Sequence, residues 1–460
     1  MDAEEKLFEA IEDEERPEVE DEENEMPMGG HQRLQRRNKA VIDKFLGKGR
    51  MMHSAVIFPE YYGELLTWAL QCYIEKEEWE VIRTLKYRAP EPVYIDVGTD
   101  YDRCENLLMN GQLIVEKDDI HLIITVDLYN PFRCGNSVQV EGTARRKKEV
   151  EAFTDGVKSI AKEQNFYRGK KVEFSRHPRL LNVKDRSWES IVLNPAIKRE
   201  VKANTVDFLR KGKRWAEYGI PQKRGVLLAG EPGTGKTIIC KALMSEVDGI
   251  TCITTNAYAL SANEYITGLY EMAEDLSPCI VFIEDIDMIG LNREEYGYRS
   301  GPALISLLNV LDGVEDKQEI ITVATTNNVE TLDRAISQRP SRFDRVITIS
   351  LPSIEERKEL TNLLCQKIPI DEPIRDYIAQ KTERCTPAQL QEVIYSLAIE
   401  HPVESIGVLS PYLEISKEKV DHAISKVNGR NRCHLGFDIE NNHNGHNVAE
   451  LNQTAVMKSD

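Results

Sequence analysis

The 460-residue sequence has no apolar run approaching the ~18 to 20 residues that a membrane-spanning helix requires. Its N-terminus is acidic, unlike a secretory signal or an arginine-rich transit peptide. We therefore expect a cytoplasmic protein with neither a membrane span nor a membrane anchor.

Two metal signatures are also missing. The nine cysteines are scattered without a C-x-x-C pair, which favours reduced thiols in hydrophobic cores over a zinc or disulfide framework. No His-Glu-x-x-His segment occurs, so a built-in zinc protease is not expected.

Positive charge is scarce at one end only. The net charge is −18, but residues 1–30 alone hold 14 acidic and 2 basic residues. The rest of the chain is therefore only mildly acidic, and generic nucleic-acid binding is not expected from it. Basic residues follow directly in 31–51, where apolar spacing allows an amphipathic helix. This arm could pack on the acidic tail or a neighbouring subunit, or instead bind nucleic acid or a membrane surface.

The most informative stretch is a glycine-rich loop between an apolar run and a helical pattern. Gly225 to Ala229 is short and almost wholly apolar, as in a strand buried on both faces of a parallel sheet. The next residues have the spacing of a phosphate-binding loop, whose glycines and helix N-terminus turn backbone N–H groups toward a triphosphate. The predicted nucleotide-binding residues are Gly230, Glu231, Pro232, Gly233, Thr234, Gly235, Lys236, Thr237 and Ile238.

Polar residues follow three further apolar runs. Glu284 and Asp285 end the run 279–283, where acids beside a phosphate loop hold Mg²⁺ and polarise the attacking water. Asn327 follows the strand pattern of 320–325, and a neutral amide there can bind the γ-phosphate and the water without repelling either. Arg339 and Arg342 precede a strand at 346–350, and their guanidinium groups suit an arginine-finger role. We therefore predict ATP and Mg²⁺ as ligands, with Thr237 and Glu284 holding the metal.

These patterns predict an α/β fold: a P-loop parallel sheet with a C-terminal helical lid, preceded by a small α+β domain. Residues 61–85, 147–164 and 204–218 are expected to be helical, and no catalytic constellation is found before residue 183. The expected organisation is a disordered acidic tail (1–30), a basic arm (31–51), an α+β domain (52–182), a nucleotide-binding domain (183–352), a helical lid (353–428) and a disordered tail (429–460).

Together, the phosphate loop, the acidic strand end, Thr326-Asn327 and the two arginines resemble the AAA ATPase family of the AAA+ superfamily, over roughly Ser187 to Lys426. Within that family, residues 208–237 are most similar to the clade of the mitochondrial translocase for the Rieske subunit. The resemblance implies a homo-oligomeric ring, usually a hexamer, in which Arg339 and Arg342 reach the neighbouring subunit's nucleotide. It places Tyr258 where the family keeps its pore aromatic, although an ordinary helix-start tyrosine fits equally well.

One departure concerns the acid pair. The family usually has Asp-Glu, whereas this chain has Glu284-Asp285, which lengthens one arm and shortens the other by about one C–C bond, ~1.5 Å. The Rieske-translocase clade shows the same inversion and hydrolyses ATP, so both acids keep their expected roles. The leading hypothesis is a ring ATPase that remodels or translocates a protein client. The alternatives are a nucleotide-gated assembly scaffold with weak hydrolysis and a nucleic-acid-handling AAA+ machine.

Overall fold

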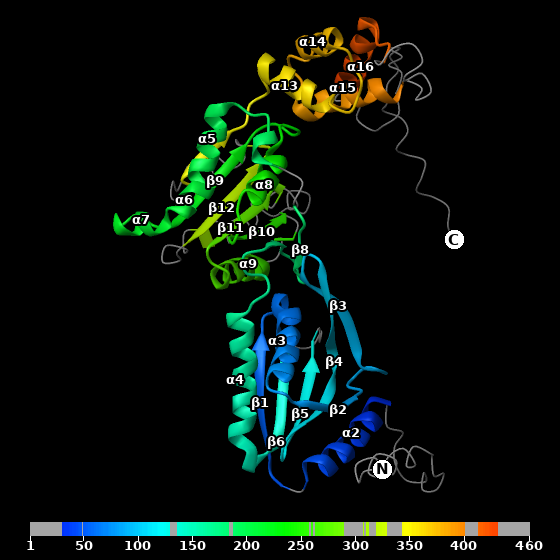
Figure 1. The fold of residues 1–460 in the computed structure, drawn as a ribbon, viewed down its shortest axis with the longest axis vertical. Helices are drawn as coiled ribbons and strands as arrows, with labels where there is room; N and C mark the ends of the chain where they lie inside the picture. The colour runs from blue at the N-terminus through cyan, green and yellow to red at the C-terminus, as the bar shows by residue number, and fades with distance from the viewer. Residues whose placement is uncertain are drawn as a thin grey trace, which may run out of the picture. The chain divides into compact units, whose positions relative to one another are not determined.

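The computed structural model describes residues 30–47, 49–128, 136–183, 187–256, 259–260, 263–288, 307, 310–311, 319–328, 343–400 and 413–430. Its contacts divide the chain into two units, Met1–Ser350 and Leu351–Asp460. The first unit contains two sheets, here called the front sheet and the nucleotide sheet (Figure 1). The expected acidic tail and C-terminal tail lie outside the described residues, apart from the helix start at Gly30 and the helix end at Arg430.

The front sheet is antiparallel and has the strand order β1-β6-β5-β4-β2, with β3 also paired to β4. Its strands are β1 (Met51–Phe58), β2 (Glu80–Leu85), β3 (Val93–Asp100), β4 (Arg103–Lys117), β5 (Ile120–Asp127) and β6 (Asn136–Thr143). The helices around it are α2 (Gly30–Leu46), α3 (Gly63–Lys76) and α4 (Lys147–Glu163), with short 3₁₀ turns at Glu60–Tyr62 and Ala144–Arg146.

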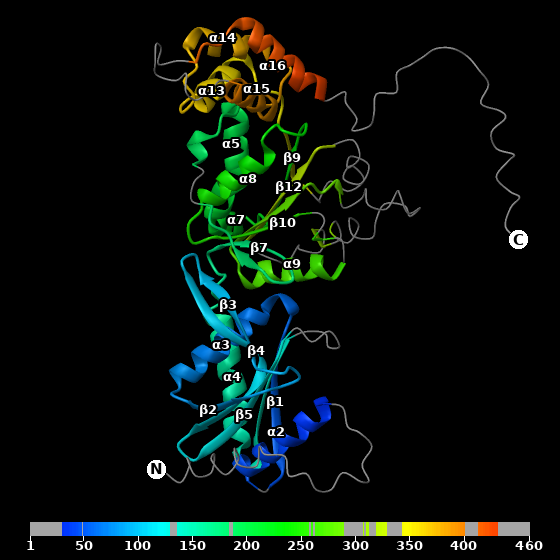
Figure 2. The ribbon, with the colours of Figure 1, turned by 90° about the vertical axis from the view of Figure 1, so that its right-hand side faces the viewer.

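Both faces of the front sheet are covered by helices (Figures 1 and 2). Because side chains alternate along a strand, Leu113 and Val115 of β4 pack into the core that contains α3 and α4. Ile114, between them, packs with Leu46 of α2 on the opposite face. The amphipathic helix expected in the basic arm is therefore present, and its apolar side covers one face of the sheet.

The nucleotide sheet has the strand order β13-β9-β12-β11-β10-β7-β8, and all its pairs are parallel except β7 with β8. This confirms the predicted α/β fold with a parallel sheet. The strands are β7 (Lys171–Glu173), β8 (Arg179–Leu180), β9 (Lys223–Ala229), β10 (Thr251–Asn256), β11 (Cys279–Glu284), β12 (Ile320–Thr326) and β13 (Arg345–Thr348).

Alternation again sends side chains of the nucleotide sheet to two different cores. Val226 and Leu228 of β9 pack against the side that carries α5, α6 and α8, and Leu227 packs on the side of α9. These helices are α5 (Pro195–Asn204), α6 (Val206–Arg210), α7 (Gly212–Glu217), α8 (Lys236–Ser245) and α9 (Asn263–Asp275), with a 3₁₀ turn at Trp188–Ser190. Burial on both faces explains why the central strands are rich in apolar residues, as in the unbroken apolar stretch of β11.

The second unit is helical in its described part and has its own core. Its helices are α13 (Ile354–Leu364), α14 (Glu372–Lys381), α15 (Pro387–Ile399) and α16 (Lys417–Arg430). Capping boxes begin two of them, Ser353 with Glu356 and Thr386 with Gln389, and Pro387 stands in the first turn of α15.

Three parts of the fold differ from the sequence-based expectation. The helix expected over 61–85 ends at Lys76; Glu78 has φ +56°, and β2 then pairs with β4. A left-handed residue cannot continue a helix, so sheet pairing prevails beyond it. The helix expected over 204–218 is divided into α6 and α7. Strand β7 lies within residues 52–182, which were expected to form the α+β domain, but it pairs with β10 and so extends the nucleotide sheet.

Among the described residues, no helix has both the length and the apolar character needed to cross a bilayer.

Candidate active site

The phosphate loop and the predicted polar residues meet at one edge of the nucleotide sheet. Strands β9, β11 and β12 are parallel neighbours, and Ala229 pairs with Thr326 while Ile283 pairs with Ala324. The residues that follow each strand are therefore brought together, as the carboxyl ends of parallel strands should be. This edge holds the loop after β9, Glu284 at the end of β11, and Asn327 after β12.

The loop after β9 depends on its glycines. Gly233 and Gly235 have φ angles of 84° and 100°, a region that side chains rarely adopt. At Gly230 a Cβ atom would lie 2.4 Å from the carbonyl oxygen of Ile349, so only glycine fits there. Helix α8 then begins at Lys236 without a side-chain cap, so the N–H groups of its first turn face the loop, where an anion can bind them.

Lys236 is 6% exposed and reaches back across the loop. Its Nζ donates hydrogen bonds to the carbonyl oxygens of Gly230 (2.7 Å) and Glu231 (3.0 Å) and to Oδ1 of Asn327 (2.7 Å). Burial lowers the pKa of its ammonium below the usual range, while the negative charges of Asp285 and Asp287 act in the opposite direction. The cation is thus surrounded by oxygen atoms that a phosphate group could replace.

The two predicted metal-binding residues are hydrogen-bonded to each other. Thr237 Oγ1 donates to Glu284 Oε2 across 2.9 Å, and both residues are partly exposed. Mg²⁺ takes hard oxygen ligands and usually binds one or two protein groups together with substrate phosphates and water. A hydroxyl and a carboxylate beside a phosphate loop fit that requirement.

Asn327 joins the lysine to the second acid. Its Oδ1 accepts from Lys236, and its Nδ2 donates to Asp285 Oδ1 across 3.0 Å, so the amide oxygen faces the cation and the amide nitrogen faces the anion. Two further contacts were not predicted from the sequence. Asp287 Oδ1 accepts from the backbone N–H of Asn327 (3.3 Å), and Thr325 Oγ1 accepts from the backbone N–H of Asp285 (3.0 Å).

A model of the "ATPase family associated with various cellular activities (AAA)" matches residues 226–351, the segment that carries this edge of the sheet. The chain carries an AAA ATPase domain. The resemblance inferred from the loop, the acids and Thr326-Asn327 is therefore confirmed at the level of the family.

Individual relatives share this AAA domain. An ATP-dependent zinc metalloprotease FtsH 1 from Alkaliphilus metalliredigens is 35% identical over 44% of this chain and 36% of its own length. A cell division cycle protein 48 homolog from Archaeoglobus fulgidus is 32% identical over 46% of this chain and 29% of its own. A putative 26S proteasome regulatory subunit homolog from Methanocaldococcus jannaschii is 32% identical over 49% of this chain and 60% of its own. The chain thus covers less than two thirds of each relative.

Three predicted functional residues lie outside the described residues: Arg339, Arg342 and Tyr258. The remaining predicted residues of the AAA domain are described. Ile238 is 39% exposed, and Glu231 and Pro232 are exposed on the loop.

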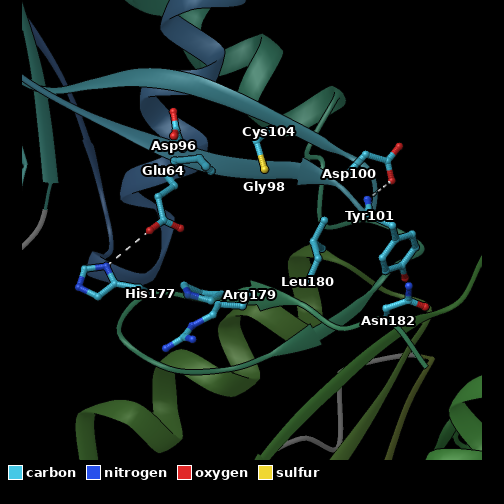
Figure 3. Close-up of a pocket in the computed structure, with 12 residues that line it drawn as sticks. Glu64, Asp96, Gly98, Asp100, Tyr101, Cys104, His177, Arg179, Leu180 and Asn182 are labelled. Atoms are coloured by element: carbon cyan, nitrogen blue, oxygen red, sulfur yellow. Dashed lines mark hydrogen bonds and ion pairs between the residues drawn. The ribbon is translucent and has the colours of Figure 1, made fainter. Parts of the chain in front are cut away.

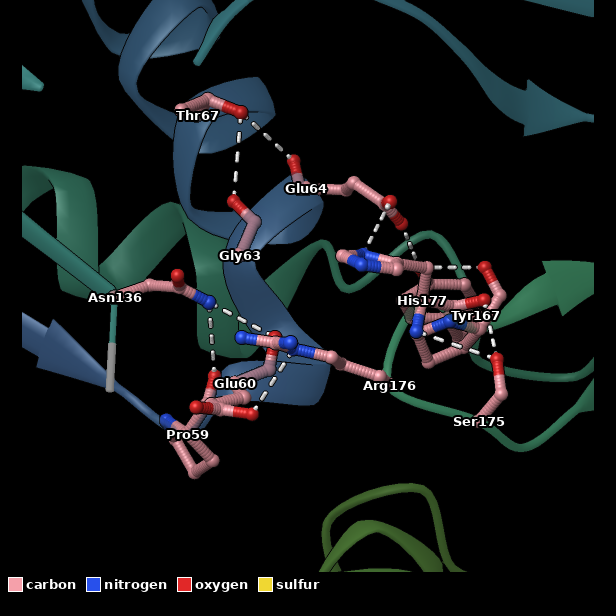
Figure 4. A network of polar contacts seen from close by, with 11 residues as sticks. Pro59, Glu60, Gly63, Glu64, Thr67, Asn136, Tyr167, Ser175, Arg176 and His177 are labelled. Atoms are coloured by element: carbon pink, nitrogen blue, oxygen red, sulfur yellow. Dashed lines mark hydrogen bonds and ion pairs between the residues drawn. The ribbon is translucent and has the colours of Figure 1, made fainter. Parts of the chain in front are cut away.

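A hollow of about 400 Å³ lies elsewhere, between β3 and the segment 177–182 (Figure 3). Its polar groups take part in contacts that attach this segment to the front domain: Glu64 accepts from the Tyr167 hydroxyl (3.2 Å) and lies 3.6 Å from His177 Nδ1. Arg176 pairs with Glu60 beside them (Figure 4). None of the residues lining this hollow belongs to the phosphate loop, so the candidate active site is the edge of the nucleotide sheet and not this hollow.

Proposed function

We propose that this chain is a Mg²⁺-dependent ATPase that works as a homo-oligomeric ring, with a hexamer as the expected size, and remodels or translocates a protein client. One observation carries the proposal: Lys236, Asn327 and Asp285 form a continuous hydrogen-bonded series beside the Thr237–Glu284 pair. A cation, a neutral amide and two acids around one phosphate loop are the parts that phosphoryl transfer to water requires.

Each residue has a distinct role in this proposal. Lys236 exchanges its loop carbonyl partners for β- and γ-phosphate oxygens, and the glycine-rich backbone donates N–H groups to them. Thr237 and Glu284 would hold Mg²⁺, which would offset the charge of the phosphates. Asp285 accepts a hydrogen bond from the attacking water, and Asn327 orients that water against the γ-phosphate.

The ring and the client follow from the family relationship and stand as proposals. Arg339 and Arg342 would contribute guanidinium groups to the neighbouring subunit's nucleotide, and Tyr258 would lie on a loop that contacts the client. Two similar proteins are named as an ATP-dependent protease and a proteasome regulatory subunit homolog, which favours a protein client over nucleic acid.

The test uses the full-length chain and replaces the phosphate-binding cation. Lys236→Ala should abolish Mg²⁺-dependent phosphate release and weaken ATP binding at least about 100-fold, since the charge-assisted contact of a buried lysine with phosphate is lost. Lys241→Ala, which removes an exposed lysine from the same helix, is the matched control and should behave as wild type. Phosphate release and calorimetric ATP binding measure both.

The outcomes separate the hypotheses. Phosphate release that persists in Lys236→Ala would contradict the proposed active site. Tight ATP binding by the wild type without any phosphate release would favour the nucleotide-gated scaffold.

A further inference from the structure

The backbone at the second acid has an unusual conformation. Asp285 has φ +54°, in the left-handed region, directly after the end of β11. Among residues other than glycine, aspartate and asparagine enter this region most readily, because their short polar side chains tolerate it. A glutamate, which the family usually has at this position, lacks that advantage.

Thr325 holds this left-handed turn at two points. Its hydroxyl accepts the N–H of Asp285 across 3.0 Å, and its carbonyl oxygen accepts the N–H of Ile286 across 2.9 Å. Thr325 is 1% exposed and is itself fixed in β12, where it pairs with Leu228 of β9. One buried threonine of β12 therefore makes two of the contacts that attach the turn after β11 to the sheet.

The turn directs the Asp285 carboxylate at Asn327. Thr325 and Asn327 are two residues apart at the end of one strand, the spacing that places side chains on the same face. One residue holds the backbone of Asp285 while the other donates to its Oδ1 across 3.0 Å. The distance between this carboxylate and the amide that would orient the water is thus set by the end of β12.

We propose that Thr325 is a positioning residue for Asp285, and that the left-handed turn it holds is why aspartate stands at this position. This inference rests on the proposed ATPase function and deepens it. The inverted pair Glu284-Asp285 is then a matched arrangement: the longer acid reaches Thr237 from the strand end, and the shorter acid occupies the turn that points it at Asn327.

The test compares Thr325→Val, which removes the hydroxyl but keeps the shape, with Thr325→Ser, which keeps the hydroxyl. In the full-length protein, Thr325→Val should lower kcat about 10- to 100-fold, since a displacement near 1 Å can cost that much. Its KM for ATP should stay within about twofold of wild type, because in the proposed function Asp285 contacts the attacking water and not the nucleotide. Thr325→Ser should restore kcat to within about threefold of wild type.

If the valine variant does not fold, Thr325→Ala removes the same hydroxyl with a smaller side chain and should give the same result.

Thr322→Val is the matched control. Thr322 is a buried threonine of the same strand, but its hydroxyl bonds to the Tyr270 hydroxyl at 2.9 Å, away from the acids. This variant loses a buried hydrogen bond too, and should keep its kcat. The inference is overturned if the valine and alanine variants of residue 325 keep wild-type kcat, if serine fails to rescue, or if Thr322→Val slows hydrolysis equally. A wild type that releases no phosphate overturns the proposed function itself, and this inference with it.

Discussion

The two sheets of the first unit differ in a way that explains where the chemistry lies. The front sheet is antiparallel, so the carboxyl ends of neighbouring strands alternate between its two edges. In the nucleotide sheet the neighbours β9, β12 and β11 are parallel, so their carboxyl ends share one edge. Lys236, Asp285 and Asn327 come from three separate chain segments and therefore lie close together at this edge.

At a strand end of the front sheet, a polar side chain contributes to stability and has no proposed part in catalysis. Asp127, at the end of β5, is 3% exposed and pairs with the Arg88 guanidinium at 3.2 Å. Asp285 lies at a comparable strand end and contacts an amide that also contacts the lysine of the phosphate loop. A carboxylate at a strand end thus contributes to stability in one sheet and is proposed to act in catalysis in the other.

The largest expected effect comes from Asp285→Asn, which keeps the shape and removes the charge. Because a positioned acid or base contributes about 10²- to 10⁴-fold to a rate, kcat for phosphate release should fall at least about 100-fold. The affinity for ATP should change by less than about threefold, since the phosphate contacts remain. Steady-state phosphate release and fluorescent-nucleotide titration measure the two quantities.

Asp127→Asn is the control from the other sheet. It weakens the ion pair between the buried Asp127 carboxylate and the exposed Arg88, so the free energy of unfolding should fall by about 1 to 3 kcal/mol while kcat stays near wild type. Equal losses of kcat in the two variants would show that the contrast between the sheets is wrong.

Glycine substitutions directly after β9 and within β3 should have smaller effects. Gly230→Ala places a Cβ 2.4 Å from a backbone oxygen, and such overpacking should lower the free energy of unfolding by about 1 to 3 kcal/mol. Gly98→Ala on β3 meets its nearest atom at 4.0 Å, so the change should be within about 0.5 kcal/mol. Urea unfolding measures the loss of stability in each variant, and hydrogen exchange of the amides in β9 and β3 shows which sheet is affected. A Gly98 variant as unstable as the Gly230 variant would contradict the packing described here.

Much of the nucleotide sheet could be predicted because its strands are buried on both faces. The runs that became β9 and β11 each contain an unbroken apolar stretch, and β12 is apolar apart from its threonines, a pattern typical of buried strands in a parallel sheet. Strand β10 (Thr251–Asn256) was not predicted, because Cys252 and Ile253 are the apolar residues among its six. The helix predicted past Lys76 was wrong because pairing of β2 with β4 outweighed a continued helical pattern.

The candidate site was likewise predicted only in part from the sequence. Lys236, Glu284, Asp285 and Asn327 were predicted as neighbours because parallel strand ends meet. The contact of Thr325 with Asp285 depends on the register between β11 and β12 and on one left-handed residue, and no sequence pattern expresses either. The roles of Arg339, Arg342 and Tyr258 stay predictions.

The smallest expected effect is at the junction of the two sheets, where Tyr61 precedes α3. Its hydroxyl donates to Glu271 Oε2 of α9 across 3.1 Å, and its ring lies 5.7 Å from that of Phe174. Tyr61→Phe removes only the hydrogen bond, and Glu271 is exposed to water, so the free energy of unfolding should fall by about 0.5 to 1 kcal/mol with kcat unchanged. Tyr73→Phe, whose hydroxyl lies 3.5 Å from the Ala152 carbonyl oxygen, is the control for losing a tyrosine hydroxyl within the front domain alone.

The pH dependence adds a signature to this junction. Burial, and then the charge of Glu271, raise the pKa of Tyr61 well above its ordinary value of 10.0. Above pH ~10 the unfolded chain releases the phenolic proton, while the folded protein keeps it. The folded state then binds more protons than the unfolded state, so the free energy of unfolding falls as the pH rises. Tyr61→Phe removes one such group and should make the loss of stability above pH ~10 less steep. Chemical unfolding curves of the wild type and of Tyr61→Phe at pH 9 and above measure that slope. An unchanged slope in Tyr61→Phe would mean that this hydroxyl is not buried between the two sheets.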